Sequence, residues 1–357
     1  MAEMQFLTGA PGFVNGSSEV NKADKEIPEM LQSQSRFFPS KNDQTKSIGG
    51  FPRLDTPENL QADLESLCRL QNSAPSSTSP SSAFFHLSPN AFDRLESLLA
   101  DIRVARFSYD YITQSAEVTM VETTVHNQCN RGIGTILESA VERLSGLVTV
   151  FATAGHHEQK EEVDALQTVS RRLRNVYCDG AAAIVVPEKC YRAPDNQFID
   201  RETKFPFPPF VVEISYSQSF ENAKKKAEQY STISDGHIRT VLIVDIEYPG
   251  ISHMRLHLFA TETAPTGERV SREVQSITLF DLADAAPPNP GPLRLFASDV
   301  LANDTEIPAR LQRPLLFEGN GDGIVHVEIP SEDLRGACLK ARELHLKKEE
   351  KAKNFWK

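Results

Sequence analysis

The feature that most constrains the fold is a strand–helix–strand pattern in the middle of the chain. It opens with the apolar run Phe210–Tyr216, which is typical of a buried strand although one acidic residue, Glu213, interrupts it. A charged, alanine-containing segment from about Glu221 to Tyr230 predicts a helix. The run Thr240–Asp245 then predicts a second strand. Strand, helix and strand of these lengths form a crossover unit, so we expect the two strands to be parallel neighbours.

Composition limits the class of protein. The 357 residues carry a net charge of −11, which argues against a surface that binds nucleic acid everywhere but leaves room for a local basic groove. The five cysteines are scattered without zinc-ligand spacing, so we expect reduced thiols in an intracellular protein, cytoplasmic or nuclear. No stretch reaches the ~18 apolar residues of a membrane span, and the N-terminus lacks the pattern of a signal peptide. We therefore expect a soluble protein with no membrane partner.

Residue composition also predicts three parts. Residues 1–86 are rich in Ser, Pro, Asn, Gln and Gly, and we expect them to be a mostly disordered arm because they can bury little apolar surface. Residues 87–330 carry the apolar patterns of a folded domain. Residues 331–357 predict a C-terminal helix that starts at Ser331 and ends in a locally basic tail, with eight Lys or Arg against three Glu from Arg335 onward.

Several further elements are predicted from periodicity. Ser88 followed by Pro89 is typical of a helix start, and the next apolar residues recur at helical spacing up to Ile102. The other predictions are a hairpin of Ala105–Tyr111 and Ala116–Val121, a helix with the apolar stripe Ile133, Leu137, Ala140, Val141 and Leu144, a helix over Glu161–Leu173, a strand over Gly180–Val186, antiparallel strands over Arg255–Thr261 and Val274–Leu279, and a narrow stripe of Leu334, Cys338, Ala341 and Leu344 on the last helix.

Two carboxylates are the first candidates for chemistry. Glu213 lies within the buried strand, where a carboxylate needs a metal, a cation or hydrogen-bond donors as a partner. Asp195 follows a proline in the segment RAPDNQF, between two predicted strands. On its own, an Asp after Pro is most often a turn residue.

A Pro-Asp step followed by an acidic residue in an apolar strand resembles the PD-(D/E)xK nuclease superfamily. The resemblance implies a mixed α/β, restriction-endonuclease-like fold in which Asp195 and Glu213 lie side by side on a hairpin and hold Mg²⁺. Hard oxygen ligands suit this ion, which would polarise a phosphodiester and activate water. The implied activity is Mg²⁺-dependent phosphodiester hydrolysis, with nucleic acid as partner.

Two narrower resemblances cover about Ala105 to Tyr248. The segments RFSYDY, VH before a helix, PDNQF, VVEISYSQ and VLIVDIEY are similar to an uncharacterised fungal group of this fold. A bacterial group of small restriction-endonuclease-like proteins has a Lys and a Tyr spaced four apart on the following helix. By position, Lys226 and Tyr230 match that pair.

The expected lysine is missing from its usual place, because Ser215 stands two residues after Glu213. The helix after the strand supplies Lys224, Lys225 and Lys226 instead. Lys226 shares a helix face with Ala223, Ala227 and Tyr230, so we expect it to reach the carboxylates and stabilise charge on the phosphate.

Three residues are secondary candidates. Tyr230 shares the face of Lys226, Gln218 is either a polar pocket residue or a strand-end cap, and Glu138 matches the acidic residue that many relatives carry on the first helix. Glu138 is offset from the apolar stripe, which favours solvent exposure. Two functions therefore stay open: a metal-dependent nuclease, or a catalytically degenerate module that kept the fold for binding or assembly, in which Lys226 only neutralises Glu213.

Overall fold

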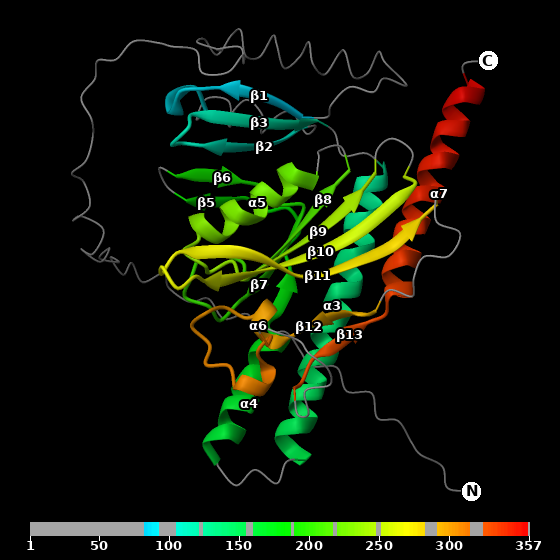
Figure 1. Cartoon of the computed structure of the whole chain (residues 1–357). Helices are drawn as coiled ribbons and strands as arrows, with labels where there is room; N and C mark the ends of the chain where they lie inside the picture. Colours follow the sequence, from blue (N-terminus) through cyan, green and yellow to red (C-terminus); the bar gives the residue numbers. More distant parts are fainter. Residues whose placement is uncertain are drawn as a thin grey trace, which may run out of the picture. The chain divides into compact units, whose positions relative to one another are not determined.

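The computed structural model describes residues 82–92, 105–120, 124–154, 160–186, 189–216, 220–247, 251–282, 291–314 and 324–355. These residues form a mixed α/β architecture in which three sheets are combined with helices (Figure 1). The predicted arm up to Ser81, the apolar helical positions after Phe92 and the tail beyond Phe355 lie outside the described residues. None of the described helices has the length and apolar composition needed to cross a membrane.

The largest sheet holds the predicted crossover unit. Its strands β8 and β9 are parallel, with Glu213 opposite Ile243, which confirms the prediction. The neighbours on both sides are antiparallel, so the sheet is mixed. Its order is β11 (Arg269–Asp281), β10 (His253–Thr263), β9 (Thr240–Ile246), β8 (Phe210–Ser215), β7 (Asn196–Asp200) and β4 (Val176–Cys178).

Helix α5 (Phe220–Ile233) connects β8 to β9 and ends in a left-handed turn. Asp235 and Gly236 both have positive φ, at 50° and 76°, and the Gly236 N–H donates to the Ser231 carbonyl at 2.9 Å. Glycine adopts this conformation at little cost, so the Ser-Asp-Gly step ends the helix and returns the chain to the sheet.

A second sheet corrects two predicted boundaries. Its order is β1 (Ser82–His86), β3 (Ser115–Met120), β2 (Ala105–Asp110), β6 (Cys190–Arg192) and β5 (Ile184–Val186). The arm was predicted to reach residue 86, but Ser82–His86 pairs with β3, because a partner strand thirty residues later supplies the hydrogen bonds. The strand predicted from Gly180 starts only at Ile184, since Gly180 has a φ of 66°. The predicted hairpin of β2 and β3 is confirmed.

The long helices cover the main core. Helix α3 (Thr124–Ala154) buries all five residues of the predicted stripe, and α4 (Lys160–Arg174) agrees with the predicted helix. Helix α7 (Ser331–Phe355) buries Leu334, Cys338 and Ala341, but Leu344 is 37% exposed, so the stripe ends one turn earlier than predicted. The remaining elements are α6 (Ala297–Val300), the short 3₁₀ helix η2 (Ala309–Leu311) and a two-stranded sheet of β12 (Leu293–Leu295) and β13 (Val327–Ile329).

Strand β8 separates two apolar clusters. Val212 and Ile214 belong to the core that includes α3 and α7 residues, whereas Val211 packs in the cluster with Ala223, Ala227 and Tyr230 of α5. Successive side chains of a strand point to opposite faces. Glu213 therefore points toward α5, into a cluster that is otherwise apolar.

Candidate functional site

Asp195 lies immediately before β7, on the strand that pairs with β8. The antiparallel register, in which Asn196 is opposite Val212, places Asp195 opposite Glu213 when it is continued by one residue. Asp195 is only 6% exposed, and its Oδ2 accepts a hydrogen bond from the backbone N–H of Ile214. The two carboxylates predicted from the sequence thus lie on neighbouring strands.

Helix α3 holds Asp195 through two side chains one helical turn apart. The His126 Nε2 lies 2.9 Å from Asp195 Oδ1, and Asn130 Nδ2 donates to the Asp195 carbonyl at 2.7 Å. One turn further on, a Cβ on Gly134 would lie 2.7 Å from Asn196 Nδ2, so glycine permits the close approach of helix and strand. His126 was part of the sequence resemblance but was given no role, although its spacing with Asn130 and Gly134 indicates a shared helix face.

Glu213 has a short hydrogen bond to the helix that follows it. The Tyr230 hydroxyl donates to Glu213 Oε1 at 2.6 Å, and both side chains are almost completely buried. Burial raises the pKa of Tyr230 well above its usual value, and the negative charge of Glu213 and the hydrogen bond to it raise it further. Tyr230 therefore stays protonated and serves as a donor to the carboxylate.

Lys226 lies between two carboxylates from different sheets. Its Nζ is 3.9 Å from Glu213 Oε2 and 3.6 Å from Glu117 Oε2 on β3. Burial lowers the pKa of Lys226, but Glu213, Glu117 and Asp195 more than offset this effect, so the pKa is raised and the ammonium stays charged. Lys225, its neighbour on the helix, is exposed. The predicted inward face of α5 is thus the one that contacts the sheet.

Glu117 was missed by the sequence analysis. It lies on β3, ninety-six residues before Glu213, and Ser108 Oγ on β2 donates to its Oε2 at 3.4 Å. No local pattern marks it, since an exposed-looking Glu in a hairpin is common. Only the pairing of the second sheet brings it to Lys226.

The other predicted residues lie apart from this cluster or cannot be placed. Glu138 is exposed on α3, as its offset from the stripe indicated, and Gln218 lies outside the described residues. Ser215, where the superfamily has lysine, is fully buried and donates a hydrogen bond to Asp245. Burial raises the pKa of Asp245, although nearby histidines and the Ser215 hydrogen bond oppose the shift.

The cluster combines three carboxylates with cationic groups. Glu213, Glu117 and Asp195 all act on the Lys226 ammonium, and His126 contacts Asp195. The Arg192 guanidinium, which lies 3.9 Å from the carboxylate of Asp110, also acts on Lys226 and Tyr230.

The donor set fits a hard divalent cation that keeps most of its waters. Among the described residues, no group of three or more His, Cys, Asp and Glu side chains has the arrangement of a complete metal site. Mg²⁺ in phosphoryl-transfer sites commonly uses only one or two carboxylates together with waters and substrate phosphates. Asp195 and Glu213 supply that number.

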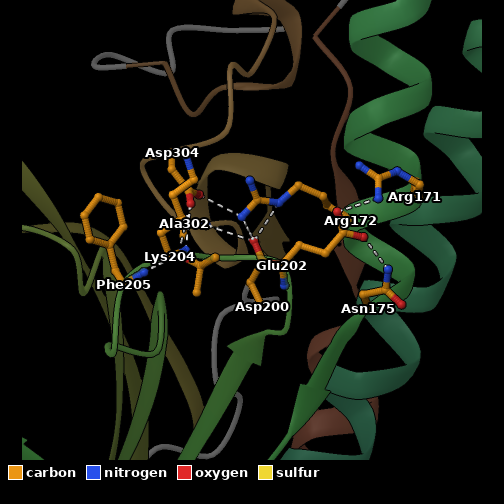
Figure 2. A network of polar contacts seen from close by, with 10 residues as sticks. Arg171, Arg172, Asn175, Asp200, Glu202, Lys204, Phe205, Ala302 and Asp304 are labelled. Atoms are coloured by element: carbon orange, nitrogen blue, oxygen red, sulfur yellow. Dashed lines mark hydrogen bonds and ion pairs between the residues drawn. The ribbon is translucent and has the colours of Figure 1, made fainter. Parts of the chain in front are cut away.

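A second buried charge network lies at the far end of β7 (Figure 2). Arg172 of α4 donates through Nε to Asp200 Oδ2 at 3.0 Å and through Nη2 to Asp304 Oδ1 at 2.8 Å. Backbone N–H groups also donate hydrogen bonds to both carboxylates. The Glu202 N–H donates to Asp200 Oδ1 at 3.1 Å, and the Lys204 N–H donates to Asp304 Oδ2 at 2.9 Å. This network joins α4, β7 and the segment after α6, and it is a structural element.

Comparison with known proteins gives no family assignment. No protein-family model matches the sequence, and no curated protein is significantly similar to it.

Proposed function

We propose that this protein is a Mg²⁺-dependent phosphodiesterase that acts on nucleic acid, with Asp195 and Glu213 as the metal-binding carboxylates. The observation that carries the proposal is the register of β7 and β8, which places the buried Asp195 and Glu213 opposite each other, with Lys226 Nζ 3.9 Å from Glu213. Two buried carboxylates side by side need a cation or hydrogen-bond donors, and a bound Mg²⁺ would be such a partner. The order of elements and the position of Asp195 opposite Glu213 support a restriction-endonuclease-like core.

Each residue has a distinct role in the proposed mechanism. Asp195 and Glu213 would hold the ion, which when bound supplies charge stabilisation on the phosphate and acidifies a water. His126 and the Ile214 N–H fix the orientation of the Asp195 carboxylate. Tyr230 fixes Glu213 in the same way. Lys226 holds a positive charge that can move from Glu117 and Glu213 toward a phosphate oxygen.

One observation favours the second candidate function, a catalytically degenerate module with a binding or assembly role. Both oxygens of Asp195 already have protein partners. Tyr230 donates a hydrogen bond to Glu213, and the Lys226 ammonium lies near it. In that case the cluster would be a closed structural network, and Lys226 would neutralise Glu213 and Glu117 permanently. The two proposals differ in what the cluster does when a cation is added.

A cleavage assay separates the two functions. Plasmid DNA, single-stranded DNA and RNA are incubated with the protein in Mg²⁺ or Mn²⁺, with EDTA as the blank. We expect cleavage by the wild-type protein and a loss of at least ~100-fold in Glu213→Gln and Lys226→Met, because each removes a charge placed at the reacting phosphate. The matched control variants, Glu142→Gln and Lys225→Met, change exposed residues and should cleave at the wild-type rate.

The lysine can also be tested by relocation. If Lys226 is the migrated superfamily lysine, Ser215→Lys in the Lys226→Met background should restore part of the activity, since residues 213 and 215 lie on the same strand face. Absence of cleavage by the wild-type protein on all three substrates, with unchanged cation binding in Glu213→Gln, would favour the degenerate module.

A further inference from the structure

Strand β11 is the outer strand of the six-stranded sheet, and its first half is exposed (Figure 1). Among the described strands it pairs with β10 alone, and from Arg269 to Glu273 only Ser271 is half-buried. From Gln275 onward the strand is flanked, because the Gln275 side chain hydrogen-bonds backbone groups at the start of β12. The free edge of the sheet is therefore the short stretch Arg269–Glu273.

Alternate residues of this stretch turn their backbone groups outward. The Thr261 N–H of β10 donates to the Arg239 carbonyl, on the β9 side, at 2.8 Å. Thr261 lies opposite Ser271, and residues that face each other without exchanging hydrogen bonds both point away from the pair, so the Ser271 N–H and C=O point outward. The alternation repeats every second residue, which turns the backbone groups of Arg269 and Glu273 outward as well. We refer to Arg269, Ser271 and Glu273 as the open edge.

The open edge can pair with itself in a matched register. An antiparallel pair of β11 strands centred on Ser271 places the two Ser271 residues opposite each other and Arg269 opposite Glu273 of the other copy. Of the antiparallel self-pairings, this is the one that uses all three outward positions of both copies. It also brings opposite charges together twice, whereas centring on Arg269 or on Glu273 places like charges opposite each other.

Both charged side chains of the open edge remain accessible to a second copy. Arg269 Nε lies 3.6 Å from an Asp235 oxygen, and the Arg269 side chain is 38% exposed. Glu273 Oε1 lies 2.9 Å from His257 Nδ1, and the Glu273 side chain is 40% exposed. Charged residues on an edge strand generally oppose pairing with other strands. Here they oppose the mismatched registers and favour the one centred on Ser271.

We propose that the open edge is the interface of a homodimer, in which the β11 strands of two copies pair antiparallel about Ser271 and join their sheets. This inference does not depend on the proposed function. Residues that pair across the two-fold axis lie on the same face of the sheet, so both copies present α5 on the same side. A pairing over Arg269–Glu273 buries less than the ~1,600 Å² of a standard interface, so we expect a reversible dimer.

Sedimentation velocity of the full chain from about 1 to 300 µM tests the interface. We expect the wild type to change from monomer to dimer over this range. Arg269→Glu and Glu273→Arg each place like charges opposite each other and should weaken dimerisation at least ~10-fold. An equimolar mixture of these two variants should dimerise as the wild type does, because each strand then meets the opposite charge at both positions. Arg174→Glu, the same change at an exposed residue of α4, is the control and should leave dimerisation unchanged.

The backbone contribution is tested by Ser271→Pro. This variant removes an outward N–H without removing a hydrogen bond to β10, so it should lose dimerisation while its thermal melt stays close to that of the wild-type monomer. A wild type that stays monomeric at all concentrations would overturn the inference. So would a mixture of Arg269→Glu and Glu273→Arg that stays monomeric, or a dimer that tolerates all three β11 variants.

Discussion

Two carboxylates on adjacent strands, Asp200 in β7 and Glu213 in β8, are both buried, but their partners differ. Asp200 accepts hydrogen bonds from the Arg172 guanidinium and from a backbone N–H group (Figure 2). Glu213 receives a tyrosine hydroxyl at 2.6 Å and an ammonium at 3.9 Å, which is beyond hydrogen-bond distance.

The difference separates a structural network from a candidate site. Arginine presents a rigid fork of donors that matches carboxylates, and Arg172 donates hydrogen bonds directly to both Asp200 and Asp304. Lysine is a point charge on a flexible stem, and at Glu213 it is shared with Glu117 from another sheet. A loosely held charge can change partners, whereas the arginine network cannot do so without loss of the fold.

The largest expected effect is on stability when the arginine network is broken. Arg172→Met leaves Asp200 without a cation in a fully buried position. We expect the free energy of unfolding to fall by about 3–5 kcal/mol, as for other broken buried pairs. Urea unfolding of the variant measures this directly, and a loss below about 1 kcal/mol would contradict the structural role.

A smaller loss is expected for Tyr230→Phe, which removes only the hydroxyl. The hydrogen bond to Glu213 is short and goes to a charged group, so its loss should cost about 1.5–3 kcal/mol. The ring stays in place, which keeps the packing against Ala223 and Ala227. Equal unfolding midpoints for variant and wild type would mean that the hydroxyl is satisfied elsewhere.

Lys226→Met should cost less stability than either change, about 1–2 kcal/mol, because its two contacts are long and its side chain is 18% exposed. Lys225→Met is the matched control and should lie within about 0.5 kcal/mol of wild type. If Lys226→Met lowers the free energy of unfolding as much as Arg172→Met, Lys226 has the same structural role as Arg172, and the two clusters do not differ in function.

Alkaline pH should weaken the site before the rest of the fold. The pKa of Tyr230 is raised above its usual 10.0 and that of Lys226 above its usual 10.5, so both bind their protons more tightly in the folded state. Their contribution is complete below these usual values and is lost as the pH rises through the folded pKa values. We expect wild-type stability to fall above about pH 10 and Tyr230→Phe to fall less steeply, as chemical unfolding from pH 8 to 11.5 would measure; parallel curves would contradict this.

The crossover unit and the direction of Lys226 were predictable because they depend on local periodicity. The apolar run of β8, the spacing of Ala223, Lys226, Ala227 and Tyr230, and the turn at Gly236 each follow from the sequence alone. The resemblance supplied the pairing of Asp195 with Glu213, which spacing could not.

The rest of the site depends on contacts between distant segments. Glu117 reaches Lys226 only because β3 joins a second sheet, and β1 was missed since its partner strand lies about thirty residues away. His126 contacts Asp195 across sixty-nine residues. Such contacts leave no local pattern in a single sequence. The spacing of four residues between His126, Asn130 and Gly134 does indicate a shared helix face, but it does not indicate which strand that face contacts.

Anomalous diffraction from crystals soaked in Mn²⁺ tests directly whether Asp195 and Glu213 bind a divalent cation. We expect a peak between the two carboxylates in the wild-type protein, which is absent from Asp195→Asn and retained in the exposed control Glu142→Gln. No peak at this position at millimolar Mn²⁺, with Lys226 still between Glu213 and Glu117, would rule out a cation site at these carboxylates.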